Sequence, residues 1–167
     1  RQMCKETVAG ELHRCTVANV YSAGNLTVTT THAQAGGIAG ECADSTLTNC
    51  FTTYGCLTAS NAALPTAVTN CYYLAESENT GSCGDYKTAD QFASGEVAYM
   101  LGDAWGQTIG TDPYPVLGGA QVYRGYTSCG DTAAIYTNDE TVSPEKPAHT
   151  GEADYTLTGD GLSLIHI

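Results

Sequence analysis

The sequence has few positive charges and few charged residues of either sign. Six Lys and Arg stand against 18 Asp and Glu in 167 residues, and the formal net charge is −12. Six cations cannot neutralise a run of phosphates, which argues against nucleic acid as a binding partner. An acidic surface also disfavours binding to an anionic membrane. Charged residues make up 14% of the chain, whereas about 25% is usual for a soluble domain. This balance predicts a soluble exported protein whose molecules repel one another.

Long hydrophobic runs and a signal peptide are also missing. No stretch of about 18 apolar residues occurs, so we expect no membrane insertion in this fragment. The chain begins with Arg1 instead of Met, and we expect its true N-terminus to be missing, so the lack of a signal peptide does not argue against export. At the other end, residues 162–167 resemble the translation of a transposase end sequence used in sequencing libraries. We expect a non-native tail there, and a short natural strand is the alternative.

Motifs for catalysis and metal binding are absent from the sequence. It contains no nucleophile elbow, no HExxH motif and no Ser/His/Asp arrangement, and its eight Cys form no CxxC pair and match no Cys/His zinc template. We therefore predict no catalytic, cofactor-binding or metal-binding residue, and no cofactor. The Cys residues leave two interpretations open: the disulfide framework of an exported protein, or small apolar side chains buried in a core.

The sequence is instead rich in residues that favour strands and turns. The chain has 11 Tyr and 19 Gly and is rich in Thr, and only one stretch has a clear helical pattern. Thr and Tyr favour strands, whereas Gly favours turns and bulges. We therefore expect a mainly β fold.

An internal repeat, in which position i matches position i+30, is the clearest feature of the sequence. Residues 8–21 match residues 38–51, so that Val8-Ala9-Gly10-Glu11 falls on Ile38-Ala39-Gly40-Glu41, and Asn19-Val20-Tyr21 falls on Asn49-Cys50-Phe51. A third, partial copy at 68–72 matches 47–51 of the second. One such unit is too small to bury its own apolar face, and a repeat of this length indicates stacked copies that share one core.

Each unit reads as short strands joined by turns. We expect a strand at 17–21, a turn at 22–25, a half-buried strand at 26–30 and a turn at Gly36-Gly37. Gly10 and Gly40 are expected where the backbone turns or packs closely.

Two repeat positions make specific structural predictions. Cys50 takes the place of Val20 in the first copy, which favours buried thiols at Cys50 and Cys71. The recurring Asn19, Asn49 and Asn70 are expected either to stack as an amide ladder or to act as ordinary turn residues.

The motifs resemble a known repeat family. Gly37-Ile38-Ala39-Gly40, followed by Leu47-x-Asn49-Cys50-Phe51 and Val68-x-Asn70-Cys71-Tyr72, resembles the GLUG-motif repeats of large surface proteins from Gram-positive gut bacteria. The resemblance covers about residues 8–75 and implies a short β-solenoid of stacked repeats over residues 1–83. It also implies an adhesive or scaffolding role with no chemistry of its own, at an extracellular or cell-surface location.

The segment 84–129 is expected to form a small α+β capping module with one helix at 89–101. Thr88 and Gln91 match a capping box, and Gly102 is placed to end the helix. Such a module would close an open end of the stacked repeats. Its aromatic residues Trp105, Tyr114 and Tyr123 are interpreted as core, with a glycan site as the alternative.

Residues 130–161 differ in character from the rest. Residues 131–160 contain seven acids and one Lys, together with two Pro and two Gly. This composition predicts an acidic linker or the start of a next module, with brief strands at 134–137 and 155–158.

Three functional hypotheses follow from the sequence. The first is a non-catalytic structural or adhesive segment, and the second is a glycan-binding module whose partner is a host or bacterial glycan or surface protein. The third is part of a larger extracellular carbohydrate-active enzyme, with Glu11, Glu41 and Asp44 as acids and Arg14 as the base, or of a peptidase whose motif would lie in other parts of the full protein. Because Glu11 and Glu41 are repeat equivalents, a structural role suits them better than a site that occurs once.

Overall fold

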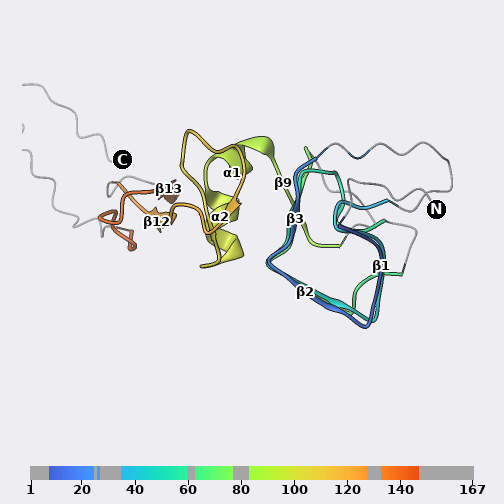
Figure 1. The fold of residues 1–167 in the computed structure, drawn as a ribbon. Coiled ribbons are helices and arrows are strands. Elements are labelled where there is room, and N and C mark those ends of the chain that lie inside the picture. The colour runs from blue at the N-terminus through green and yellow to red at the C-terminus, as the bar shows by residue number, and fades with distance from the viewer. Residues whose placement is uncertain are drawn as a thin grey trace, which may run out of the picture.

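The computed structural model describes residues 8–24, 26, 35–59, 63–76, 83–127 and 133–146. In this part of the chain the protein is mainly β, with many short strands and two short helices (Figure 1). The first nine strands are β1 (Ala9–His13), β2 (Thr16–Ala18), β3 (Tyr21–Ser22), β4 (Ala39–Ala43), β5 (Thr46–Thr48), β6 (Phe51–Thr52), β7 (Ala67–Thr69), β8 (Tyr72–Leu74) and β9 (Asp85–Lys87).

These nine strands form three parallel sheets, which together we call the parallel stack. Their orders are β1-β4, β2-β5-β7 and β3-β6-β8-β9. Val17 pairs with Leu47, and Leu47 pairs with Val68. Tyr21, Phe51 and Tyr72 pair in the same order, and in Figure 1 the strands of each sheet lie over one another around one outline. The sequence repeat is therefore also the pairing register of the strands.

The turns of the parallel stack recur at the same spacing. Asn19, Asn49 and Asn70 lie between the second and third sheets with φ of 55°, 52° and 49°. Asn tolerates this left-handed conformation better than other side chains, which explains its recurrence. The expected strand at 17–21 is thus two strands, β2 and β3, separated by a corner at Asn19. Arg14 and Asp44 form the corresponding left-handed corner between the first and second sheets, with φ of 54° and 50°.

The core of the parallel stack is built from repeat-equivalent side chains. Its fully buried members include Ile38, Leu47 and Cys50, each 0% exposed, and Cys71, which is 2% exposed. The prediction that Cys50 and Cys71 are buried is therefore confirmed. Their equivalent in the first copy, Val20, is only partly buried, because β1, β2 and β3 each have a described partner strand on one side only.

The segment after β9 contains two helices where the sequence predicted one over 89–101. They are α1 (Ala89–Ala93) and α2 (Glu96–Leu101), and Gly95 separates them with φ of 90°. In this conformation a residue with a side chain is strained, and a Cβ at Gly95 would lie 2.4 Å from Cδ1 of Ile109. The expected capping box of Thr88 and Gln91 begins α1, and Gly102 ends α2, so both helix boundaries are confirmed.

Residues 88–127, the flanking module, pack against the side of the parallel stack. Phe51 of β6 contacts Phe92 and Trp105 at ring-centroid distances of 5.6 and 5.3 Å. Lys87 Nζ lies 2.6 Å from Glu96 Oε1, which joins β9 to α2. In Figure 1 the helices lie beside the sheet that contains β3 and β9. The sequence pattern instead predicted a position over an open end of the stack. The pattern does not reveal that the paired rings of Tyr21, Phe51 and Tyr72 point out of the stack and pack against the flanking module.

The remaining strands form two antiparallel pairs. β10 (Trp105–Gly106) pairs with β11 (Val116–Leu117), and β12 (Tyr123–Gly125) pairs with β13 (Ile135–Thr137). β13 confirms the brief strand expected near 134–137 and joins this part of 130–161 to the flanking module. The expected strands at 26–30 and 155–158 and the tail 162–167 lie outside the described residues, apart from Leu26. No described helix has the length and apolarity needed to cross a membrane.

Candidate functional site

The carboxylates proposed for catalysis lie on the surface of the parallel stack. Glu11 and Glu41 are direct neighbours on β1 and β4. At the next corner Asp44 Oδ2 lies 4.0 Å from Arg14 Nε and 3.9 Å from His13 Nε2. The Arg14 and Asp44 side chains are 78% and 67% exposed, so this contact is an ordinary surface ion pair and not part of a cleft. The structure thus brings the candidate residues together in two separate pairs: Glu11 with the half-buried Glu41 on neighbouring strands, and Arg14 with Asp44 at the exposed corner.

Trp105 does not lie on an open surface. It is 2% exposed and packs edge-on against the stacked rings of Tyr21 and Phe51, whose centroids are 5.9 and 5.3 Å away. Tyr114 packs edge-on against Phe92, and Tyr123 lies half-buried on β12. Burial therefore removes Trp105 from the aromatic glycan site considered above and makes it part of the core that joins the flanking module to the parallel stack.

The described Cys residues are thiols that line the stack. None of the six described Cys is in a disulfide, and Cys4 and Cys129 lie outside the described residues; the six are Cys15, Cys42, Cys50, Cys56, Cys71 and Cys83. Sγ of Cys50 donates to the Thr48 carbonyl, and Sγ of Cys71 donates to the Thr69 carbonyl, in the same geometry one repeat apart. Among the described residues no group of three or more His, Cys, Asp or Glu is placed to hold a metal ion.

Buried thiols should resist modification. We expect N-ethylmaleimide to modify Cys50 and Cys71 at pH 7 at least about a thousandfold more slowly in the native protein than in urea, because access requires unfolding. The hydrogen bond with the Cys50 thiol and then burial also raise the pKa of Cys71, which lowers its thiolate fraction. Peptide mass spectrometry after timed quenching measures each site, with the partly exposed Cys15 as the internal reference. Rapid labelling of Cys50 or Cys71 in the folded protein would contradict their place in the core.

The Asn column combines the two roles that the sequence left open. Nδ2 of Asn70 donates to Oδ1 of Asn49 over 3.1 Å, so these two amides form a rung of a ladder across adjacent strands. Both residues also occupy the left-handed corner, and each role favours Asn. The ladder does not extend to Asn19, whose buried Oδ1 has no hydrogen-bond partner among the described residues, so its role is that of the left-handed corner.

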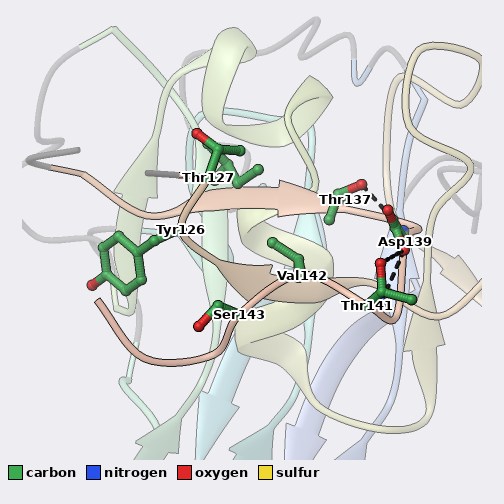
Figure 2. Close-up of a pocket in the computed structure, with 8 residues that line it drawn as sticks. Tyr126, Thr127, Thr137, Asp139, Thr141, Val142 and Ser143 are labelled. Carbon is green, nitrogen blue, oxygen red and sulfur yellow. Dashed lines mark hydrogen bonds between the residues drawn. The ribbon is translucent and has the colours of Figure 1, made fainter. Parts of the chain in front are cut away.

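A pocket of about 520 Å³ opens beside the β12–β13 pair. Figure 2 shows Val142 in its middle, Tyr126 on one side and the turn from Thr137 to Thr141 on the other. The lining residues are Tyr126, Thr127, Ile135, Thr137, Asp139, Thr141, Val142 and Ser143. The lining thus combines hydroxyl groups and one carboxylate with the apolar side chains of Ile135 and Val142. The sequence did not predict this site, because its residues come from two segments that pattern alone does not pair.

Two polar residues hold the region of the pocket in place. Gln107 is 0% exposed, and its Nε2 donates to the carbonyls of Phe92 and Asp112 at 2.9 and 2.7 Å. Nδ2 of Asn138 donates to the carbonyls of Gln107 and Gln121, both at 2.8 Å, and its Oδ1 accepts from the Ile109 amide. Thr137-Asn138-Asp139 has the composition of a turn, which is the signal that could have predicted this anchor.

Comparisons of the chain with protein-family models, with curated proteins and with solved structures find no match. The interpretation of function therefore depends on the geometry of the chain itself.

Proposed function

We propose that the parallel stack is a short β-solenoid of the GLUG-like kind and that the chain is a non-catalytic structural or adhesive segment of a secreted or cell-surface protein. The observation that carries the proposal is the register of the three parallel sheets, because the repeat-equivalent residues that lie in strands pair with one another. A stack of this kind grows by adding units and presents long flanks, which suits a spacer or a display surface.

The distribution of side chains supports the same proposal. The interior holds aliphatic side chains, thiols and the ring of Tyr73, and the flanking module packs on the outer face of β6 and β8. Of the acids and the base considered for catalysis, Glu11, Arg14 and Asp44 lie exposed and contribute to solubility, whereas Glu41 is half-buried on β4. The net charge of −12 suits an exported segment that must not associate with its neighbours.

Antibody labelling of producing cells tests this location. We expect antibodies raised against the purified chain to label intact cells, or to detect the protein in the culture supernatant, as strongly as they label permeabilised cells. An antibody against a cytosolic enzyme, which should label permeabilised cells only, is the control. Labelling that requires permeabilisation, with nothing in the supernatant, would overturn the proposal of a surface or secreted segment.

A further inference from the structure

We propose that the pocket beside β12 and β13 binds a neutral carbohydrate, with Asp139 and its neighbouring hydroxyl groups as the polar contacts. This proposal deepens the adhesive role proposed above and rests on it, because it gives the segment a ligand class and a place to bind it. The site differs from the aromatic set of Trp105, Tyr114 and Tyr123, none of which lines the pocket.

The pocket has the size of a sugar-binding site. Small-molecule sites generally have volumes of about 300–1,000 Å³, and the 520 Å³ here lies in that range. Thr127, Asp139 and Ser143 are exposed on its rim, so the ligand would lie at the surface, as a chain end or a branch of a larger glycan does. The apolar side chains of Ile135 and Val142 and the ring of Tyr126 provide contacts for the C–H face of a sugar ring.

The polar side of the pocket is ordered before any ligand arrives. Asp139 Oδ1 accepts hydrogen bonds from the amide and the hydroxyl of Thr141, at 2.9 and 2.7 Å. The Asp139 amide donates to Thr137 Oγ1, and Asn138 fixes the start of the turn to the flanking module. On the other side the Tyr126 amide donates to the Ser143 carbonyl at 2.9 Å. A ligand therefore does not have to order these residues, which favours affinity at a small contact area.

The donors and acceptors of the pocket that are not used within the protein indicate which class of ligand can bind. Oδ2 of Asp139 has no partner among the described residues, and the hydroxyl oxygens of Thr141 and Ser143 already donate and retain lone pairs. The hydroxyl of Thr137 accepts from the Asp139 amide and keeps its own proton to donate. A ligand with many hydroxyl groups can donate and accept at these atoms together.

The charge of Asp139 favours neutral over anionic sugars as ligands. The Thr141 hydroxyl and amide hold the pKa of Asp139 below its usual range, so this carboxylate is ionised at neutral pH. No Lys or Arg is among the described residues that line the pocket. Among the described cations, Arg124 lies against Tyr126 of this lining. At the Asp139 side the acidic groups of sialylated, sulfated and uronic-acid glycans would be repelled, whereas a neutral sugar would donate its hydroxyl protons to the carboxylate.

A glycan array that carries neutral, sialylated and sulfated oligosaccharides, followed by saturation-transfer NMR with each oligosaccharide that binds, tests the proposal. We expect at least one neutral oligosaccharide to bind and the anionic ones to fail. Asp139→Asn keeps the acceptor for Thr141 but removes the charge, and should weaken binding about tenfold or more, since hydrogen bonds to charged groups are the strong ones. Ser143→Ala, which removes only an exposed hydroxyl, should weaken binding less.

Asp103→Asn removes the same charge from an exposed residue outside the pocket and should bind as the original protein does. Thermal melting of every variant shows that it is folded. Three results would overturn the proposal: no neutral oligosaccharide binds at millimolar concentration, only anionic glycans bind, or binding is unchanged in both Asp139→Asn and Ser143→Ala. None of them bears on cell-surface labelling, so a failure of this site is distinguishable from a failure of the proposed function.

Discussion

Replacing Phe51 by Ala is expected to reduce the free energy of unfolding by about 3–5 kcal/mol, the range for deleting a buried aromatic ring. Phe51 is 0% exposed and stacks on Tyr21 with an interplanar angle of 14°. It also contacts Phe92 and Trp105 of the flanking module, so its removal opens a cavity between the parallel stack and α1. Urea denaturation followed by circular dichroism measures the change.

Tyr21→Ala is the matched control, because Tyr21 is the repeat equivalent of Phe51 on the neighbouring strand. Tyr21 is 46% exposed, and we expect the loss of its ring to reduce the free energy of unfolding by about 1–2 kcal/mol, in proportion to the smaller area that it buries. Equal losses in the free energy of unfolding, or a smaller loss for Phe51→Ala, would contradict the packing of the flanking module on β6.

A single methyl group at Gly36 is expected to reduce stability by about 3 kcal/mol or more, at the upper end for overpacking a core. A Cβ at this position would lie 2.4 Å from the Ala39 carbonyl oxygen, 2.4 Å from Thr58 Cα and 2.6 Å from the Leu57 carbonyl oxygen. These are backbone atoms of β4 and of the segment paired with it, so no side-chain rotation can relieve the clash. Gly36→Ala should therefore shift the urea midpoint strongly, or leave the chain unfolded.

Gly10→Ala provides the comparison. The Cβ would meet nothing within 4 Å, and Gly10 lies in β1 with no left-handed φ to preserve. We expect this variant to be neutral or slightly stabilising, since Ala restricts the unfolded chain more than Gly does. The sequence predicted a turn or a close contact at Gly10, and this prediction was wrong. Equal losses in the two variants would contradict the tight packing assigned to Gly36.

The repeat was the part of the fold that could be predicted from the sequence. A constant offset between like side chains of the first two copies became the register of three sheets, because similar units bury their apolar faces best against copies of themselves. Burial of Cys50 could be inferred from Val20 at the same position, since a thiol behaves as a small apolar group. These inferences rest on comparing copies within one chain.

Features that occur once were predicted less well. The apolar spacing over 89–101 was correct, but it does not report that Gly95 adopts a left-handed conformation and divides the helix. The pocket was missed altogether, because β12 and β13 are joined by residues whose pattern carries no signal of pairing. Gln107 and Asn138 position that region through hydrogen bonds that depend on tertiary contacts and leave no periodic trace in the sequence.

The shorter spacing between the second and third copies has an evolutionary consequence. Between β3 and β4 the chain uses residues 23–38, whereas between β6 and Thr58, which pairs beside Ala39, it uses only residues 53–57. The main difference in length between successive copies thus lies in the connection from the third sheet back to the first. The pairing registers of the second and third sheets are unaffected. Insertions and deletions can accumulate at this edge while selection preserves the interior, so connecting segments of different length can diversify without any repacking of the core.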